Sequence, residues 1–157
     1  MTEAEVIALF PERDDLQWGD VRLRLEMRTP AVPDRDILPA CSFGIHRQVD
    51  DQRVGHISFR LGPEAGAVAI IGHIGYGIDK AYRGNGYATQ ACRALRPLLA
   101  KHLGEVVITC DPENTASARS IEKLGATYET TVEVNAGEIL KRAQGCIRKR
   151  RYRWRVR

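Results

Sequence analysis

The segment spanning residues 67–88 constrains the fold more than any other part of the chain. An apolar run over 67–78, interrupted by three glycines, leads into a glycine-containing loop over 79–86. We interpret the run as one long strand, and its glycines as points where another group approaches the backbone or where the strand bulges. A helix is expected to begin near Tyr87, because apolar residues follow it at helical spacing. The segment therefore predicts a strand, a loop and a helix in succession.

The same order of elements repeats further along the chain. A short apolar strand over 106–110 is followed by a loop and by a second helix over 115–124, which Gly125 closes. Pro97 lies inside the first helix and is expected to kink or split it. This succession predicts a βαβ unit with parallel strands inside a mixed sheet, so the fold class is α/β (α+β). The other strands are expected at 21–27, 41–47, 53–61, 128–135 and 145–156, and a helix capped by Thr2 at 3–10.

The loop between the strand and the helix is suited to binding an anion. Unpaired backbone N–H groups and the helix dipole favour negative charge at a helix N-terminus. Gly84 and Gly86 would let phosphate oxygens approach the backbone, and Arg83 adds a positive charge, so the loop suits a pyrophosphate. The alternative is that the glycines only close a tight turn. Neither the GxxxxGK(S/T) motif of P-loop enzymes nor the GxGxxG spacing of dinucleotide-binding folds is present.

The run Arg83-Gly84-Asn85-Gly86-Tyr87-Ala88 resembles the R/Q-x-x-G-x-G/A signature of the GCN5-related N-acetyltransferase (GNAT) family. Residues 72–79 resemble the family's fourth strand, and 114–126 resemble its N-x-x-(A/S)-x-x-x-x-E-K-x-G-F segment, with Ala126 where Phe is usual. The close match covers about residues 53–126. It implies a single GNAT-like domain over 1–157, in which a mixed central sheet with a splayed parallel strand pair is flanked by helices.

The resemblance also implies the ligand and its site. In the family, amides of the loop hold the CoA pyrophosphate, and the pantetheine arm lies between the two splayed strands, where an Asn after the fifth strand contacts it. Acetyl-CoA is therefore the expected cosubstrate, and no metal is expected. The implied cofactor-binding residues are Ile78, Asp79, Arg83, Gly84, Asn85, Gly86, Tyr87, Ala88, Thr89, Asn114 and Ser117.

The reaction implied by the family is direct attack of a primary amine on the thioester in a ternary complex. The amine could belong to a small molecule, a peptide N-terminus or a lysine. Many members place a Tyr near the cofactor sulfur as the acid, but the matching position here is Ile121, which leaves Tyr76 and Tyr128 as candidate substitutes. His73 is a candidate base. A structural role for His73 is favoured, because strand alternation puts it on the face opposite Tyr76.

Basic residues are concentrated at the C-terminus. Residues 148–157 hold seven of the 24 Lys and Arg residues, and the rest of the chain has 17 basic against 20 acidic residues. The strict alternation from Arg151 predicts a final strand with Tyr152, Trp154 and Val156 in the core and the arginines in solvent. A nucleic-acid-binding surface is the less favoured interpretation. The alternative function is accordingly an acetyl-CoA-binding or nucleic-acid-binding module with weak or no catalysis.

Location and assembly are only loosely constrained. The chain has no stretch resembling a signal peptide or a membrane span, and its four cysteines form no CxxC pair, so we expect a cytoplasmic protein with free thiols. Members of the family usually have two helices between their first two strands. Here residues 29–40 leave room for little helix, so the acceptor cleft is expected to be either open or completed by a second subunit in a homodimer.

Overall fold

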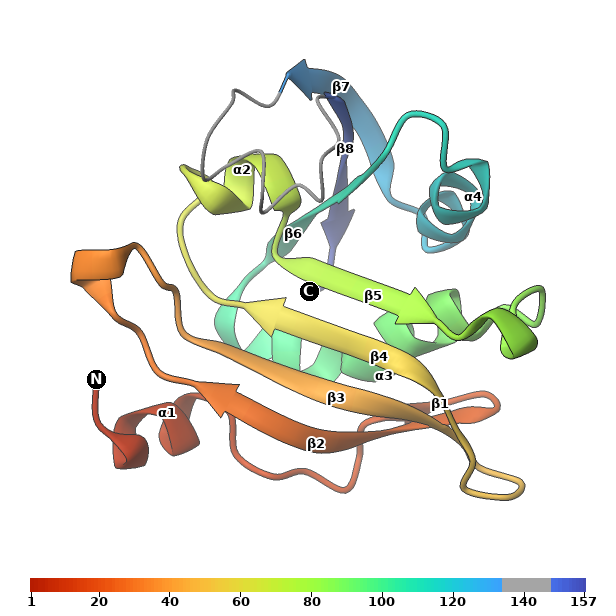
Figure 1. The fold of residues 1–157 in the computed structure, drawn as a ribbon, viewed down its shortest axis with the longest axis horizontal. Coiled ribbons are helices and arrows are strands. Elements are labelled where there is room, and N and C mark those ends of the chain that lie inside the picture. Colours follow the sequence, from red (N-terminus) through yellow and green to blue (C-terminus); the bar gives the residue numbers. More distant parts are fainter. Residues whose placement is uncertain (134–147) are drawn as a thin grey trace.

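The chain of 157 residues is built around one eight-stranded sheet (Figure 1). The computed structural model describes residues 1–133 and 148–157. Among these strands, β5 and β6 are parallel and the other neighbouring pairs are antiparallel, which confirms the predicted mixed sheet. The strands, in their spatial order, are β1 (Gln17–Trp18), β2 (Val21–Thr29), β3 (Ala40–Arg47), β4 (Arg53–Arg60), β5 (Ile74–Ile78), β6 (Glu105–Cys110), β8 (Arg148–Arg155) and β7 (Thr127–Glu133).

Helices lie on both faces of the sheet. In Figure 1 the long helix α3 lies behind β4 and β5, on what we call the back face, whereas α2 lies on the front face. No helix in the described part of the chain is long and apolar enough to cross a membrane. The helical segments are α1 (Glu3–Leu9), the 3-10 turn η1 (Pro33–Arg35), α2 (Ala67–Ile71), the 3-10 turn η2 (Lys80–Tyr82), α3 (Tyr87–His102) and α4 (Thr115–Lys123).

Most predicted elements are confirmed. The strands expected at 21–27, 41–47, 53–61 and 106–110 are found within two residues of their predicted ends, and the second and third of these form an antiparallel hairpin. Thr2 caps α1 as predicted: its hydroxyl accepts a hydrogen bond from the amide of Glu5 (3.2 Å), and the Glu5 carboxylate accepts one from the amide of Thr2 (2.6 Å). The two-residue strand β1 was not predicted. It is too short to carry a periodic signal.

The main core lies between α3 and the back face of the sheet. The side of α3 that faces the sheet is apolar, with Leu95, Leu98 and Leu99 fully buried. Alternate residues of β4, Ile57 and Phe59, are also fully buried and belong to the same cluster. The two periodicities, about 3.6 in the helix and 2 in the strand, thus bring their apolar residues together on one face of the sheet.

The prediction of one long strand over 67–78 is wrong in its first part. Residues 67–71 form the short helix α2, and the strand begins only at Ile74. Gly72 ends the helix with φ +76° and ψ 176°, and a Cβ built on it would lie 2.7 Å from the carbonyl oxygen of Val107 in β6. The glycine therefore reverses the chain and lets it pass close to β6. An apolar run of five residues contains no period that separates a buried helix from a buried strand.

Pro97 does not split α3, so the second of the two predicted outcomes, a kink or a split, is wrong and the kink stays a prediction. The helix runs from Tyr87 to His102 through Pro97. Pro97 is exposed, on the side of the helix away from the core. The carbonyl that loses its helix hydrogen bond there can instead be hydrated, which lowers the cost of the proline.

The C-terminal strand β8 buries Tyr152 and Trp154 in the core as predicted, and Val156, just after the strand, is also buried. Arg155 is exposed as predicted, but two other arginines of the strand are paired with acids. Arg151 and Arg153 both pair with Glu64, at 3.0 and 2.7 Å, and both also contact Glu129. The outer ends of the strands predicted at 128–135 and 145–156 fall within 134–147, outside the described residues.

Replacing Gly72 by Ala is expected to lower the free energy of unfolding by roughly 3 kcal/mol, because the new methyl group meets the Val107 carbonyl at an unfavourable φ. Gly66→Ala is the matched control. Gly66 also has positive φ (+54°), but its Cβ would meet nothing within 4 Å, so a loss of about 1 kcal/mol is expected. Urea titration measures both, and equal losses would contradict the close approach of Gly72 to β6.

Candidate functional site

The parallel strands β5 and β6 separate soon after they meet. Their register contains one pair, Ile74 with Ile108, and Figure 1 shows the two strands diverging beyond it. The amide of Asp79 donates to β4, so odd-numbered residues of β5 direct their backbone groups toward β4. The backbone N–H and C=O groups of Tyr76 and Ile78 therefore point into the gap, where β6 is too far away to pair with them. An extended chain of amides could bind along this edge as an added strand.

A loop rich in unpaired amides follows β5. Gly84 and Gly86 have φ of +83° and +75°, and Gly86 is the N-cap residue of α3. Gln90 is the first residue of the helix whose amide donates to a backbone carbonyl, that of Gly86 (3.2 Å). Among the described residues, the amides of residues 84–89 donate to no protein acceptor. The loop therefore presents a set of N–H donors at the positive end of a 16-residue helix.

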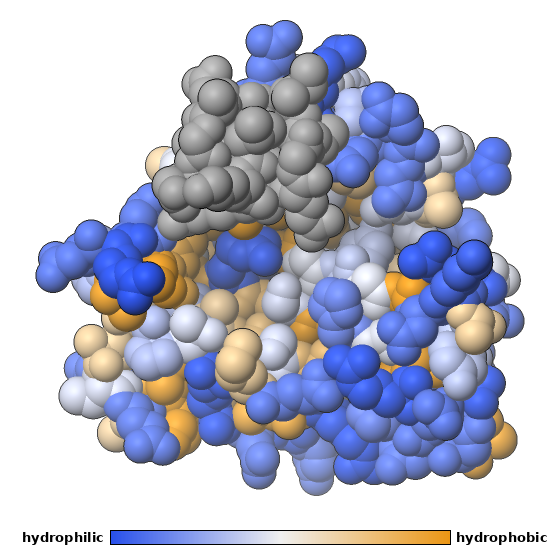
Figure 2. Space-filling view, viewed as in Figure 1, coloured by the Kyte–Doolittle hydropathy of each residue, from blue (hydrophilic) through white to orange (hydrophobic). Residues whose placement is uncertain are grey.

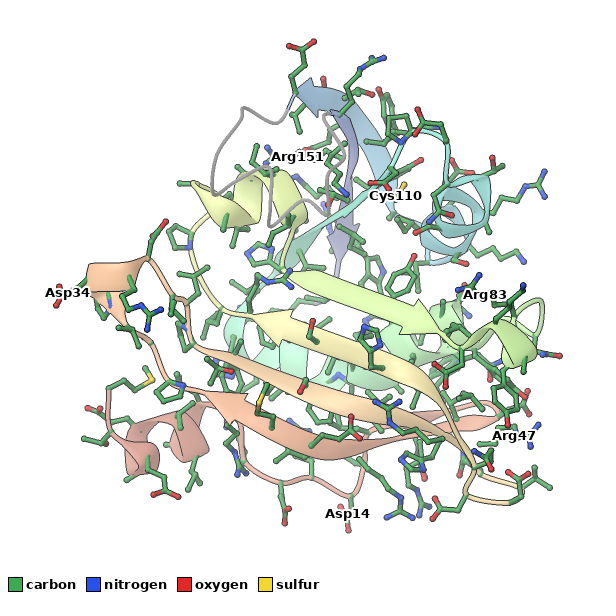
Figure 3. All side chains as sticks on the ribbon, in the orientation of Figure 1. Asp14, Asp34, Arg47, Arg83, Cys110 and Arg151 are labelled. Atoms are coloured by element: carbon green, nitrogen blue, oxygen red, sulfur yellow. The ribbon has the colours of Figure 1, made fainter. Side chains whose placement is uncertain are left out.

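Side chains of the loop mainly fix its shape. The Asn85 amide nitrogen donates to the carbonyl of Tyr82 (2.9 Å), and Arg83 Nε donates to the carbonyl of Ile78 (2.9 Å). Figure 3 shows Arg83 beside the loop that follows β5, and its side chain is exposed. Asp79 begins η2 by accepting from the amide of Tyr82 (2.9 Å).

The first residues of α3 contribute backbone rather than side chains. Tyr87 and Ala88 are buried, and Tyr87 belongs to the core cluster. The Thr89 hydroxyl donates to the carbonyl of Ser120 in α4 (3.1 Å), so it ties the two helices together. Their amides, however, remain available to an anion at the helix N-terminus.

Asn114, Ser117 and Tyr76 meet where α4 approaches the gap. Asn114 caps α4, because its Oδ1 accepts a hydrogen bond from the amide of Ser117 (3.0 Å), and its side-chain NH₂ group has no partner among the described residues. The hydroxyls of Tyr76 and Ser117 are 2.7 Å apart. Burial raises the pKa of Tyr76, so this phenol is protonated at neutral pH and can donate a hydrogen bond.

All three residues line a cavity of about 240 Å³ that continues onto the front face of the sheet. Gly75 and Gly77 leave that face of β5 without side chains, while β4 contributes a polar row of alternate residues. Figure 2 shows this face, where hydrophilic and hydrophobic residues are interspersed. The lining residues are His56, Ser58, Arg60, Ile71, Ile74, Gly75, Tyr76, Thr109, Cys110, Asp111, Asn114, Ser117 and Lys149.

The residues of the front face were not among the predicted site residues. The alternation His56-Ile57-Ser58-Phe59-Arg60 carried the only signal, since it places the three polar residues on the face opposite the core. Lys149 and Asp111 lie far apart in the sequence and form an ion pair in the cavity. Cys110, labelled in Figure 3 at the end of β6, also lines the cavity, and burial raises the pKa of its thiol.

His73 lies just before β5 and does not line the cavity that contains Tyr76. Its Nδ1 accepts a hydrogen bond from the amide of Val107 (3.0 Å), and its Nε2 donates to the carbonyl of Gly62 (3.1 Å). This arrangement requires the neutral ring, and burial lowers the pKa of His73. Since both ring nitrogens are engaged by backbone groups, the geometry favours a structural role over that of a base.

Tyr128 lies on the edge strand β7, separated from β6 by β8. Its hydroxyl is 2.8 Å from that of Thr131, and its ring packs against Tyr152 and under Arg150. It does not line the cavity that contains Tyr76. Ile121, at the position where many relatives have Tyr, is fully buried in the core. Within residues 1–133 and 148–157, no cluster of His, Cys, Asp and Glu could hold a metal ion.

Comparison with solved structures finds the same fold in acetyltransferases. The microcin C7 self-immunity acetyltransferase MccE, in complex with acetyl-CoA and AMP, has a TM-score of 0.57 at 20% identity, covering 74% of this chain and 61% of that one. The ribosomal L7/L12 α-N-protein acetyltransferase RimL, in complex with coenzyme A, has a TM-score of 0.56 at 22% identity, covering 74% and 62%.

Sequence comparison gives the family. YkkB, an uncharacterized protein of Bacillus subtilis (strain 168), is 32% identical over 87 residues, which are 53% of this chain and 51% of YkkB. The matched part of the chain thus spans about half the length of YkkB. The family model of the GNAT acetyltransferase domain matches residues 2–127, which include β5, the amide-rich loop, α3 and α4. The chain belongs to the GNAT family of acetyltransferases.

Proposed function

We propose that residues 1–157 form one acetyltransferase domain that transfers the acetyl group of acetyl-CoA to a primary amine. The observation that carries this proposal is the open edge of β5 with the unpaired amides of 84–89 at its end. CoA has a pyrophosphate and an amide-containing pantetheine arm, and the two features match these two groups in order along the chain. Membership of the GNAT family supports the same ligand.

In this proposal the backbone does most of the binding. The amides of 84–89 hold the pyrophosphate, and Arg83 adds a charge near it. The pantetheine amides pair with the unpaired backbone groups of Tyr76 and with the amide of Ile78, whose carbonyl already accepts from Arg83. The unpaired NH₂ group of Asn114 donates to the same arm. The thioester then reaches the cavity at the level of Gly75 and Tyr76.

The chemistry requires no covalent enzyme intermediate. A neutral amine attacks the thioester carbonyl, and the resulting oxyanion is stabilised by backbone N–H groups of β5. The C–S bond then breaks, and the sulfur takes up the proton that the amine nitrogen loses, which yields the amide and CoA thiol. The protonated Tyr76 hydroxyl, held by Ser117, donates a hydrogen bond to the departing sulfur. His56 is the imidazole that lines the cavity and is the candidate base.

The second candidate function, binding of nucleic acid by the C-terminal arginines, receives no support from the geometry. Arg151 and Arg153 are paired with Glu64 and Glu129.

The acceptor site is proposed to be open to solvent. Between β2 and β3, the described chain forms only the short turn η1. A peptide N-terminus, a lysine or a small amine could enter there. A homodimer and a cytoplasmic location remain predictions, the latter supported by the free, buried thiols of the described residues.

Acetyl-CoA is expected to bind to the wild-type protein in isothermal titration, and Gly84→Ala is expected to weaken this binding about 10-fold. Gly84 has φ +83° with open space at its Cβ, so the substitution strains the loop without a clash. Gly66→Ala, with similar strain far from the loop in sequence, is expected to leave affinity unchanged. No binding of acetyl-CoA at millimolar concentration would defeat the proposed function.

Tyr76→Phe is expected to lower kcat by about 10- to 100-fold with little change in the KM for acetyl-CoA, because it removes a donor to the departing sulfur. Ser117→Ala is expected to have a smaller effect in the same direction. The matched control is Tyr128→Phe, which should keep full activity because Tyr128 lies outside the cavity. Release of CoA thiol with an amine panel measures these rates, and equal kcat in the two Tyr→Phe variants would exclude Tyr76 from the reaction.

A further inference from the structure

Arg60 is the last residue of β4 and extends over the front face of β5. Its Nη1 donates to the carbonyls of Gly72 (2.8 Å) and Ile71 (3.4 Å) at the end of α2. Its Nη2 lies 3.3 Å from the position that a Cβ of Gly75 would occupy, which is also 3.3 Å from the Ser58 hydroxyl. The guanidinium is thus anchored at one nitrogen, beside the part of β5 where the proposed thioester would lie.

The described residues place no acidic side chain in an ion pair with this guanidinium. Among the described residues, Arg60 forms no ion pair, and its Nε and Nη2 have no hydrogen-bond partner. The side chain that carries these two nitrogens lines the cavity. Burial lowers the pKa of Arg60, which reflects the cost of holding a positive charge in this position without a counter-ion. An arginine remains charged at any physiological pH.

Among the described residues that line the cavity, the charged side chains are Arg60, Lys149 and Asp111, with formal charges that sum to +1. Lys149 and Asp111 form an ion pair with each other. Arg60 has no acidic partner within the described part of the chain, and its Nε and Nη2 form one edge of the planar fork that binds a carboxylate or phosphate in bidentate fashion. A polycationic amine would be repelled here, whereas an amine with a nearby anionic group would be attracted.

We propose that Arg60 forms an anion subsite of the acceptor site, and that the acceptor is a primary amine carrying a carboxylate or a phosphate close to its amino group. This inference rests on the proposed acetyltransferase function and names the class of acceptor. The anion pairs with Nε and Nη2 of Arg60 on the front face. The amino group then lies at the level of Ser58 and Gly75, beside the thioester.

Matched acceptors test the inference. β-Alanine and β-alaninamide share one amine and differ in the carboxylate, and O-phosphoethanolamine and ethanolamine differ in the phosphate. The wild-type protein is expected to favour the anionic member of at least one pair by about 10- to 100-fold in kcat/KM, as a charge-assisted hydrogen bond would provide. The pair that shows the larger ratio distinguishes a carboxylate from a phosphate.

Arg60→Gln is expected to reduce this ratio to near one while leaving the neutral acceptor within about 3-fold of wild type. Arg60→Lys keeps the charge and a donor to Gly72 but loses the fork, so an intermediate ratio is expected. Arg53→Gln is the control: Arg53 lies on the same strand but pairs with Glu26 outside the cavity, and the ratio should not change. Thermal unfolding of each variant shows whether it is folded.

The outcomes separate the inference from the proposed function. Absence of acetyl-CoA binding defeats both. If acetyl-CoA binds and neutral amines are acetylated without preference for the anionic partners, only the anion subsite is overturned. If Arg60→Gln lowers kcat/KM equally for both members of a pair, Arg60 stabilises the oxyanion rather than the acceptor. That result also overturns the anion subsite. If no acceptor is acetylated, the affinity of the CoA-saturated protein for each acceptor is measured by titration. Equal affinity for the anionic and the neutral member of each pair overturns the anion subsite.

Discussion

The site depends on the single point at which the parallel strands β5 and β6 are joined. At that point the backbone amide of His73 donates to the carbonyl of Val107 (2.8 Å), while the His73 ring accepts from the Val107 amide (3.0 Å). One residue therefore satisfies both backbone groups of Val107. Immediately beyond Ile74 the strands separate, because no further pairing holds them. Because β5 and β6 are paired at one end and separated at the other, the unpaired edge of β5 lies in the middle of the sheet rather than at its outer edge.

An unpaired strand edge leaves backbone N–H and C=O groups without hydrogen-bond partners, which costs free energy when they are buried and promotes aggregation when they are exposed. The unpaired edge of β5 in the middle of the sheet therefore needs a physical explanation. Here α4 lies across the gap, and the contact between Ser117 and Tyr76 connects it to β5. The edge is thus shielded from a second protein chain but remains accessible to a thin, extended ligand. The unpaired amides at the start of α3 lie at the end of the same strand. Backbone geometry, rather than any one side chain, therefore determines which ligand fits.

The sequence predicted the half of the site that is contiguous in the chain. Strand β5, the loop and α3 follow one another, so the positions of Gly84, Gly86 and the helix start could be read directly, and the alternation in β8 placed Tyr152 and Trp154 in the core. The helix at 67–71 could not be predicted, because a five-residue apolar run has no period. The sequence favoured a structural role for His73 but could not identify its partners Gly62 and Val107, since the fold brings them to it.

The acceptor half was not predicted because the fold assembles its cavity from residues of β4, α2, β5, β6, α4 and β8. Arg60 and the arginines of β8 look alike in the sequence, and only the fold separates their roles. Arg151 and Arg153 lie beside Glu64 and Glu129 and are neutralised within the protein. Within residues 1–133 and 148–157, the hydrogen bonds of the Arg60 guanidinium go to backbone carbonyls. A carbonyl dipole orients a guanidinium but does not cancel its charge, so binding of an anion would offset part of the free energy that burying Arg60 costs. Two central arginines of the basic tail are therefore paired within the protein, whereas the positive charge that the inferred acceptor site uses is a single residue in the middle of the chain.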